Sequence, residues 1–283
     1  MPRAILHIPW GPQALAKAVL CPGDRLRISA QPAADFQITR DRRIGAASAE
    51  LSWDGTVGQV TTDPKNDAFL LNGQARQQGT IQHGEWFRIG DTTLMLCEEQ
   101  HTPPRRPKTR QTAEEQQARL ARASLCEEVL ATLRRTQNLY AVLDAARDDR
   151  ILTLLRESAN PARSLLAGVR GDTLSDVAPY LVALAPDDWL LAALVQEGWG
   201  QSWGIFLDCP KPFDEVRRHF RHFLRVRAEG EKDFLYFRFY DPRVLGIFLP
   251  TCTPEQQREF FGPIQTFWAE DAALSLRGFS ALT

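Results

Sequence analysis

Short apolar runs separated by turn residues fill the first third of the chain. The runs are "RLRIS", "DFQIT", "AELSW", "AFLLNG", "EWFRIG" and "TTLMLCE", with Gly, Asp and Asn between them. They recur about every ten residues, a spacing typical of the strands of an all-β sandwich. We therefore predict an all-β sandwich over residues 1–99.

A charged segment that contains prolines follows the predicted sandwich. Residues 100–112 read "QHTPPRRPKTRQT" and include no large apolar side chain. This composition indicates an exposed linker. A helix is predicted over residues 113–136, because Leu120, Leu125, Val129 and Leu133 recur at helical steps and form one apolar stripe. Residues 100–137 are thus expected to be a linker with a connecting helix.

Strand and helix patterns alternate over residues 138–283. The runs "LYAVLDAA", "RSLLAG", "APYLVAL" and "WGIFLD" are typical of buried strands, and "PDDWLLAALVQEG", "PFDEVRRHFRHFLRV" and "TPEQQREFFG" are typical of helices. This alternation predicts an α/β domain with a mixed sheet. The whole chain is therefore predicted to be an α+β multidomain protein.

The stretch "FLYFRFYDPRVLGIFLP", residues 234–250, gathers several residues that can carry chemistry. Its first half alternates in the manner of a strand, and Pro242 should end that strand because proline has no backbone N–H to donate. Asp241 can then cap a helix that begins at Pro242 or Arg243. We interpret the stretch as a structural joint between a strand and a helix.

The charged residues of this joint leave other interpretations open. Arg238 and Arg243 can pair with Asp241 or with Asp144 from the first strand of the domain. The alternative is an anion-binding or enzymatic site built from Arg238, Tyr240, Asp241 and Arg243. Such a site predicts a concave polar pocket around Asp241.

Composition and charge narrow the classes of function. Hydrophobic residues make up 43% of the chain and charged residues 24%, and the formal net charge is -1. This balance gives no general attraction to nucleic acid or to anionic membranes. No apolar run approaches the roughly 18 residues of a membrane-spanning helix, and the first residues do not resemble a signal peptide. We expect a cytoplasmic protein that does not bind nucleic acid and has no membrane span.

The remaining reactive residues predict no cofactor or metal. The five cysteines are scattered and never spaced as C-x-x-C, so we expect buried, reduced thiols. His219 and His222 lie three residues apart but lack a third metal ligand nearby, and a basic helix face is favoured there. The motifs of nucleotide hydrolysis and of α/β-hydrolases are absent from the sequence. We therefore predict no catalytic residue, no cofactor and no metal site.

Several stretches of the predicted sandwich resemble a forkhead-associated (FHA) domain over about residues 15–97. They are Asp35-Phe36-Gln37-Ile38, Ile44–Leu51, Leu70-Leu71-Asn72-Gly73 and the closing "GTIQHGEWFRIGDTTLML". FHA domains read phosphothreonine, so the resemblance implies a protein-binding module.

The positions that bind phosphate in the FHA family differ in this chain. Ile28-Ser29-Ala30 replaces Ile-Gly-Arg, Gly45-Ala46-Ala47-Ser48 replaces Ser-x-x-His, and Asp67 falls where the family often has Asn. An aspartate would repel phosphate. We therefore expect a degenerate site at Ser29, Ala30, Gly45, Ser48 and Asp67, and a docking module that does not need phosphate. The alternative is a phosphothreonine-dependent signalling module that regulates secretion and uses Arg40, Arg42 and Arg43.

The second domain resembles a domain-of-unknown-function family of type VI secretion effector adaptors, the Tap/TEC chaperones. The resemblance covers about residues 138–280 and rests on Leu139–Ala146, Ala178–Leu184, Ser202–Leu207, Phe237–Leu245 and Glu259–Ile264. Ser202 stands where a His is common in the family. The family motif falls on Trp203, Gly204, Arg238, Tyr240, Asp241, Pro242 and Arg243, to which we assign a structural role.

This second resemblance implies a function. Such adaptors bind a toxic effector in the cytosol and help load it onto the spike protein VgrG, and no catalysis is attributed to them. We therefore expect a non-enzymatic adaptor/chaperone whose residues 138–283 bind the effector. Its partners would be a cognate effector and VgrG.

Overall fold

The computed structural model describes residues 2–11, 13–44, 48–62, 69–105, 112–166, 174–226 and 235–281. The chain divides into two compact units. The first contains Met1–Thr102, Thr153–Pro161 and Ala167–Ser175, and the second contains Pro103–Leu152, Ala162–Leu166 and Asp176–Thr283.

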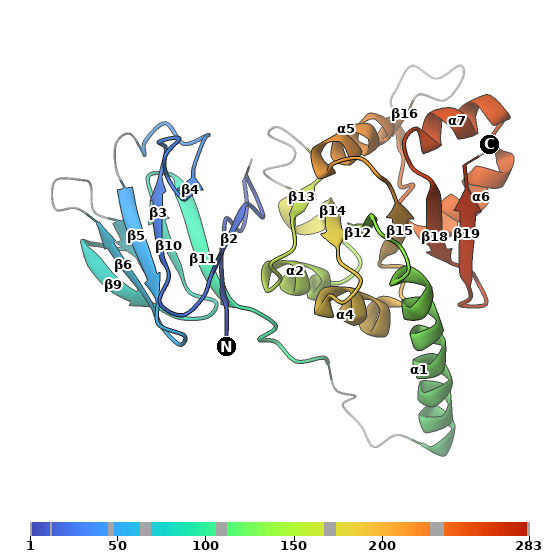
Figure 1. Cartoon of the computed structure of the whole chain (residues 1–283), viewed down its shortest axis with the longest axis horizontal. Helices are drawn as coiled ribbons and strands as arrows, with labels where there is room; N and C mark the ends of the chain where they lie inside the picture. The colour runs from blue at the N-terminus through green and yellow to red at the C-terminus, as the bar shows by residue number, and fades with distance from the viewer. Residues whose placement is uncertain are drawn as a thin grey trace. The chain divides into compact units, whose positions relative to one another are not determined.

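The first unit is the predicted β-sandwich, and Figure 1 shows its strands at the blue end of the colour scale. One sheet has the order β2-β1-β11-β10-β7-β8, formed by β1 (Ala4–His7), β2 (Lys17–Leu20), β7 (Phe69–Leu71), β8 (Gln74–Arg76), β10 (Trp86–Ile89) and β11 (Thr92–Glu98). The other has the order β4-β3-β5-β6-β9, formed by β3 (Arg25–Ser29), β4 (Phe36–Gln37), β5 (Ser48–Trp53), β6 (Gly58–Thr62) and β9 (Gln78–Ile81).

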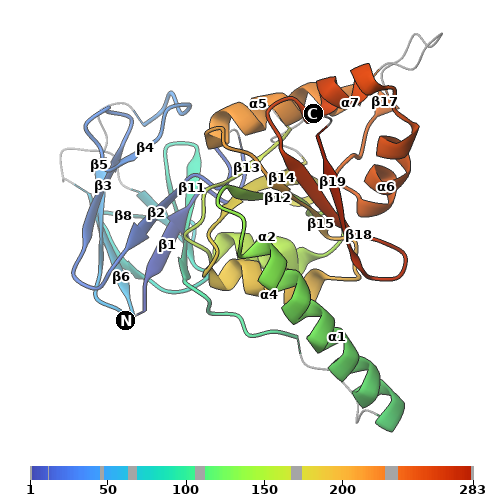
Figure 2. The ribbon, with the colours of Figure 1, turned by 45° about the vertical axis from the view of Figure 1, so that its right-hand side comes forward.

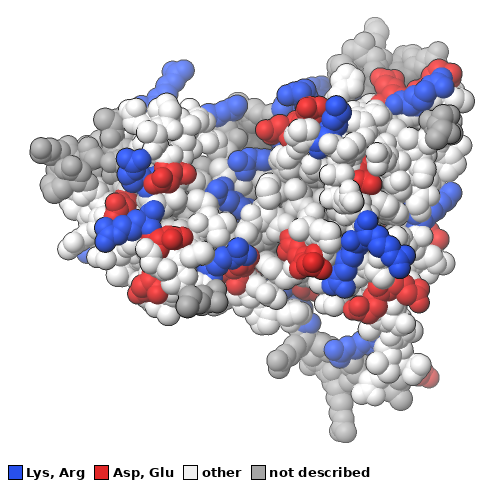
Figure 3. All heavy atoms as spheres, in the orientation of Figure 1, with Lys and Arg blue, Asp and Glu red and all other residues white. Residues whose placement is uncertain are grey.

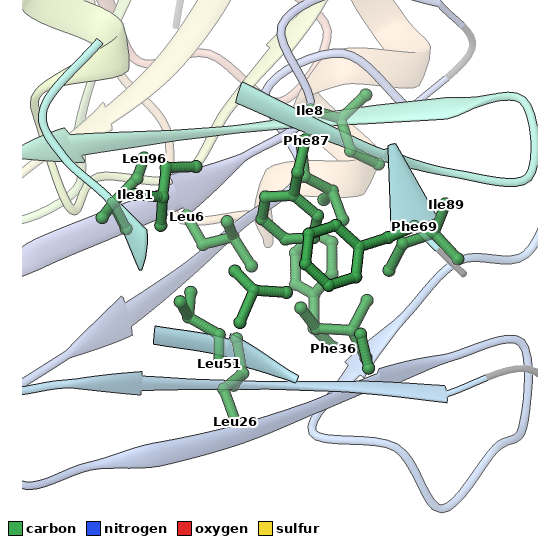
Figure 4. Packing of buried hydrophobic residues seen from close by; sticks show 14 of the residues in the cluster. Leu6, Ile8, Leu26, Phe36, Leu51, Phe69, Ile81, Phe87, Ile89 and Leu96 are labelled. Carbon is green, nitrogen blue, oxygen red and sulfur yellow. The ribbon is translucent and has the colours of Figure 1, made fainter. Parts of the chain in front are cut away.

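Alternation along the strands builds the core of the sandwich. In β3, Leu26 and Ile28 are buried whereas Arg25 and Arg27 are exposed. Figure 4 shows that side chains from both sheets, including Leu6, Leu26, Phe69 and Phe87, point into one apolar layer. Period-two burial on two facing sheets is the packing of a β-sandwich.

The segment Thr153–Pro161 belongs to the same compact unit as the sandwich. The Lys17 ammonium donates to the carbonyl of Leu155, and to those of Ser158 at 2.8 Å and Asn160 at 3.0 Å. One cation thus satisfies several backbone carbonyls, as lysine does at helix ends. No local sequence pattern predicts this link, because it joins residues that are far apart in the chain.

The second unit contains a six-stranded sheet with the order β13-β14-β12-β15-β18-β19. Its strands are β12 (Leu139–Asp144), β13 (Ala162–Ser164), β14 (Pro179–Leu184), β15 (Gly204–Asp208), β18 (Thr266–Glu270) and β19 (Leu276–Ser280). Every pair of neighbouring strands in this described sheet is antiparallel, so the expected mixed sheet is wrong. The alternation of strands and helices does not determine strand direction, and the β18–β19 hairpin contains no helix.

Helices cover both faces of this sheet, as Figure 2 shows. The described helices of this unit are α1 (Ala113–Leu133), α4 (Trp189–Gly198), α5 (Phe213–Phe223), α6 (Pro242–Thr251) and α7 (Pro254–Phe261). The helix α2 (Asp149–Arg156) begins in this unit and ends in the first, and the 3-10 helix η1 (Ser175–Val177) begins in the first unit and ends in this one. Tyr140 and Val142 of β12 pack in the cluster that includes residues of α5, α6 and α7, whereas Leu143 lies beside Leu194 of α4. A strand covered on both faces is buried throughout, and every residue of β12 is buried.

Helix α1 buries less of its apolar stripe than expected. Leu120 is 65% exposed, whereas Val129 and Leu133 are buried. Helix α1 packs against α4, and the Arg122 guanidinium near the middle of α1 donates to the carbonyls of Glu197 at 3.1 Å and Trp199 at 2.7 Å. The prediction for Leu120 is wrong because no side chain among the described residues buries it.

The structure corrects two further expectations. The alternating stretch forms only a short strand, β17 (Leu235–Tyr236), which pairs with β16 (Arg225–Val226) outside the main sheet. Phe234 lies outside the described residues. All five cysteines are free, but Cys21 is exposed and Cys252 is half-buried, so the expectation of burial fails for both. None of the described helices combines the length and the hydropathy that crossing a membrane requires.

Candidate functional site

Asp144 stands at the end of the central strand β12 and is 1% exposed. The Arg238 guanidinium donates to its Oδ2 atom, and the backbone N–H of Ala146 donates to Oδ1 at 3.3 Å. The Arg147 Nε atom lies 3.8 Å from the same Oδ2. A buried carboxylate needs such partners, because desolvation of an unpaired charge is costly.

Asp241 is the second buried carboxylate of the site and is 4% exposed. Its Oδ1 accepts from the backbone N–H of Arg243 at 3.0 Å and from Arg243 Nε at 2.9 Å. Its Oδ2 accepts from Arg147 Nη2 at 2.8 Å and Arg243 Nη2 at 2.6 Å. Asp241 is therefore both the N-cap of α6 and one end of an arginine bridge to the segment that follows β12.

The local sequence explains why the chain turns here. The backbone N–H of Asp241 donates to the carbonyl of Arg238 at 3.0 Å, which closes a turn. Pro242 then occupies the first turn of α6, where its missing N–H has no cost. Phe239 and Tyr240 are buried, whereas Leu235 and Tyr236 of β17 are 52% and 48% exposed. The stretch is thus a hairpin strand, a turn and a capped helix rather than a long strand.

Trp203 and Gly204 hold the neighbouring strand β15 against β12. The carbonyl of Trp203 accepts from the backbone N–H of Asp144 at 2.8 Å. A Cβ atom on Gly204 would lie 2.1 Å from the carbonyl oxygen of Val142, so only glycine permits this approach. Ser202, with φ +54°, donates its N–H to Glu270 at 2.8 Å. These residues position the end of β12 on which Asp144 sits.

The chemistry available to this cluster is limited by its own hydrogen bonds. Asp241 accepts at four sites, which is about the full capacity of a carboxylate, so none remains for a metal or a water. Burial raises the pKa of the Tyr240 hydroxyl, and its hydrogen bond with Tyr236 raises it further, so the phenol stays protonated. Asp144, Arg147, Arg238, Asp241 and Arg243 thus form a cluster of ion pairs that joins the end of β12 to the start of α6. We call this cluster the charged brace.

His219 and His222 do not share a site. His219 Nε2 lies 2.8 Å from the carbonyl oxygen of Phe260, whereas His222 is exposed. Burial lowers the pKa of His219, which favours the neutral imidazole that donates to this carbonyl. Over the described part of the chain, no three or more His, Cys, Asp or Glu side chains gather in a way that could hold a metal ion.

The predicted basic face of α5 exists in part. Arg218 and Arg221 of α5 are exposed, whereas Arg217 is half-buried and donates from Nε to the carbonyl of Ser164 at 2.9 Å. Arg225 is exposed as well but lies in β16, beyond the end of α5. Figure 3 shows basic and acidic side chains interspersed over the face in view, in keeping with the net charge of -1.

The structure describes only part of the degenerate FHA-type site. Ser29 ends β3, is 5% exposed, and its hydroxyl accepts from the N–H of Gln31 at 3.1 Å. Ala30 packs against the sandwich core. Ser48 pairs with Ser29 across β3 and β5, whereas Gly45 and Asp67 lie outside the described residues.

The loop arginines near this site are exposed. Arg40, Arg42 and Arg43 all reach solvent, and Arg43 forms an ion pair of 3.0 Å with Asp91. Asp41 anchors the loop by accepting from the backbone N–H of Asp91 and the hydroxyl of Thr92, both at 2.7 Å. Although burial acts to raise the pKa of Asp41, its hydrogen bonds outweigh that effect and lower the pKa.

Arg147 is the residue of the charged brace that sequence analysis missed. It follows Asp144 by three residues, and this spacing is the signal in the sequence that could have revealed it. Its contact with Asp241 joins residues 94 positions apart, which no local pattern predicts.

Comparisons with known proteins found a similarity for each part of the chain. Residues 139–259 match the family described as "Domain of unknown function (DUF4123)". This match includes the whole charged brace. The sequence has no significant match among curated proteins.

The N-terminal sandwich resembles FHA domains of known structure. The FHA domain of CT664 from Chlamydia trachomatis is 17% identical, with 34% of this chain and 96% of that chain covered and a TM-score of 0.31. The FHA domain of an Arabidopsis thaliana hypothetical protein is 18% identical, with 38% and 92% covered and a TM-score of 0.31. The cytoplasmic domain of PscD, a T3SS sorting platform protein from P. aeruginosa, is 21% identical, with 39% and 93% covered and a TM-score of 0.31.

Proposed function

We propose that this protein is a non-enzymatic adaptor that binds a type VI secretion effector in the cytosol and helps load it onto the VgrG spike. The observation that carries the proposal is the match of residues 139–259 to DUF4123, a family associated with effector adaptors of this secretion system. The effector-binding role is assigned to the α/β domain, residues 138–283.

The geometry around Asp241 supports a binding role over catalysis. A general base needs a free lone pair within reach of a substrate proton. The Asp241 oxygens are occupied by Arg147 and Arg243, and Arg238 and the N–H of Ala146 hold those of Asp144. The site thus stabilises the fold on which a partner docks.

The sandwich is proposed to serve as a docking module that does not need phosphate. The position of the phosphate-binding arginine is Ala30, which packs on the core, and the Ser29 hydroxyl is engaged with Gln31. This module would supply the second contact of the adaptor, with the spike or with another component of the secretion machinery.

Co-purification tests the proposal. The full-length protein, carrying an affinity tag, is expressed with the toxic effector encoded beside its gene, and the control is an effector encoded beside a different spike gene. We expect the neighbouring effector alone to co-purify in a stoichiometric complex. Equal recovery of the two effectors, or of neither, would refute the proposal.

A further inference from the structure

Strand β19 is an edge of the antiparallel sheet in the second unit, and its only hydrogen-bonded neighbour in the described sheet is β18. The N–H of Ala281 donates to the carbonyl of Gln265, and the N–H of Asp271 donates to that of Ser275. Because antiparallel ladders alternate, Arg277 and Phe279 form the hydrogen-bonded pairs with β18. The backbone N–H and C=O groups of Leu276, Gly278 and Ser280 therefore point away from the sheet.

The opposite edge of the sheet is closed by side chains. Strand β13 has three residues, and the carbonyl of Ser164 accepts from Arg217 Nε of α5 at 2.9 Å. The Ser164 hydroxyl accepts from the N–H of Leu166 at 3.0 Å. Protected edges of this kind do not add strands readily. Strand β19 has five residues and contains neither proline nor lysine; its one charged residue is Arg277, and no side chain of the described residues bonds to its outward backbone groups.

A groove of about 450 Å³ lies next to the free edge. Apolar residues that line it are Ala269 of β18, Phe279 of β19 and Ile247 of α6, and the charged residues that line it are Arg243, Glu270, Asp271 and Arg277. Ile247 is 72% exposed, and a Cβ atom on Gly246 would meet no atom within 4 Å. These residues make one part of the groove apolar and open to solvent, beside its charged residues.

The end of the groove is fixed rather than loose. Leu274, with φ +63°, forms the turn between β18 and β19, and its carbonyl accepts from the indole N–H of Trp199 at 2.7 Å. The Asp271 carboxylate accepts from the N–H groups of Ala273 and Ser275, both at 2.9 Å. A partner would therefore meet a preformed surface, which lowers the entropic cost of binding.

Charge on the rim favours an acidic occupant. The Cζ atom of Arg277 lies 4.7 Å from the ring centroid of Phe279, and Arg277 forms no ion pair with a carboxylate of the described residues. Glu270 and Asp271 also line the groove and keep their negative charges, but their carboxylates are held by backbone N–H groups of neighbouring loops rather than by Arg277. A carboxylate of the partner would thus find a cation within reach at this edge.

We propose that β19 and this groove bind an extended segment of the effector, which adds a strand to the sheet and places a large apolar side chain beside Ile247 and an acidic one beside Arg277. Main-chain hydrogen bonds to Leu276, Gly278 and Ser280 supply affinity, and the groove selects the side chain. This inference rests on the adaptor function proposed above.

Three variants of the full-length protein test the surface. Gly278→Pro removes an outward N–H without breaking a bond to β18, and proline is tolerated on such edges. Ile247→Glu places a charge in the groove at an exposed position. The matched control is Val177→Glu, a charge placed on η1 at a side chain that is 49% exposed and outside the groove.

Two probes are used, so that failure of the adaptor function is separated from failure of the edge. One is the effector encoded beside the gene, and the other is a phage-displayed library of random dodecapeptides panned against the wild-type protein. If Gly278→Pro and Ile247→Glu keep the wild-type melting temperature, we expect each to bind the effector and the selected peptides at least about tenfold more weakly than the wild-type protein does. Val177→Glu should bind both as the wild-type protein does. We expect the selected peptides to share an apolar residue with an acidic neighbour.

Each remaining outcome has a defined meaning. If the wild-type protein binds the effector, unchanged affinity in folded Ile247→Glu or folded Gly278→Pro would overturn the edge inference alone. If the wild-type protein does not bind the effector, the adaptor proposal fails, and the library decides the edge by itself. A library that yields no peptide, or only peptides insensitive to these variants, would overturn the edge inference.

Discussion

A single carboxylate joins two segments of the second unit that are distant in sequence. Asp241 caps α6 through the backbone of Arg243 and also receives Arg147 from the segment after β12. Both roles depend on the carboxylate charge, since an amide or a methyl group cannot accept from two guanidinium groups and a helix N-terminus together. A substitution that removes the charge of Asp241 should therefore also lower the stability of the fold.

Asp241→Ala should therefore destabilise the fold. It removes the cap and leaves the partly buried Arg147 without its 2.8 Å partner, so we expect the free energy of unfolding to fall by about 2 to 4 kcal/mol. Chemical denaturation measures this, with Asp187→Ala, an exposed aspartate, as the control. Loss of effector binding in a variant that keeps wild-type stability would instead show that Asp241 contacts the partner.

His7 of β1 gives the first unit a defined pH dependence. It is fully buried, and burial, then the charges of Arg156 and Lys17, lower its pKa to about 3. Unfolded histidine has a pKa of about 6.5. Between these values the unfolded state binds a proton that the folded state does not. The stability that neutral His7 contributes is therefore fully present above about pH 6.5 and is lost as the pH falls toward 3.

We expect the melting temperature of the wild-type protein to fall more steeply between pH 7.5 and pH 5 than that of His7→Asn. For each pH unit below 6.5, the free energy of unfolding of the wild-type protein should fall by about 1.4 kcal/mol more than that of His7→Asn. His222→Asn, which changes an exposed histidine, is the control and should keep the wild-type slope. If the melting temperatures of the wild-type protein and His7→Asn change equally with pH, this assignment is wrong.

At the scale of elements, the sequence predicted those whose signals are local. Thr253 begins α7 with a complete capping box, and Asp241 caps α6, both within four residues of the helix start. The β18–β19 hairpin was missed because its turn reads Asp-Ala-Ala-Leu, without the Gly or Asn that marks most turns. Leu274 adopts a positive φ there, and the Trp199 indole that holds it comes from another part of the chain.

The contacts of the candidate site also divide into a local one, which the sequence predicts, and distant ones, which it does not. The Arg243–Asp241 contact spans two residues and follows from the sequence of the joint. The Arg238–Asp144 and Arg147–Asp241 contacts each span 94 residues and depend on the folded sheet. Strand alternation was overestimated in the stretch before Asp241 because the aromatic residues there pack around a turn.

Aromatic packing joins the elements on one face of the second sheet. Phe260 of α7 is 1% exposed, and its ring centroid lies 5.2 Å from Phe223 of α5, 5.3 Å from Phe267 of β18 and 5.2 Å from Phe248 of α6. One side chain thus contacts four elements including its own. Edge-on and offset rings add favourable energy beyond area burial.

Phe260→Ala should cost about 3 to 5 kcal/mol, because it leaves a cavity between these elements. The control is Ile247→Ala, whose side chain is 72% exposed and whose loss should change stability by about 0.5 kcal/mol or less. Denaturant titration monitored by tryptophan fluorescence measures both. Similar destabilisation by the two substitutions would show that the aromatic cluster does not hold the elements together.

At the scale of the whole molecule, an FHA-like sandwich and a region matching DUF4123 share one chain. The formal net charge of -1 gives no strong overall attraction to a charged partner, so in the proposed function specificity rests on shaped surfaces such as the β19 edge and its groove. The proposed adaptor has to make two separate contacts, and each of the two compact units is proposed to supply one of them. Loss of the protein should then stop delivery of one cargo rather than operation of the whole apparatus.

Secretion in a strain that lacks this gene tests the adaptor function most directly. The effector encoded beside the gene and the VgrG spike are both quantified in the culture supernatant by immunoblotting. We predict that the effector disappears from the supernatant while the spike is secreted as in the wild type, and that the full-length gene restores effector secretion. Normal effector secretion in the deletion strain would contradict the adaptor function.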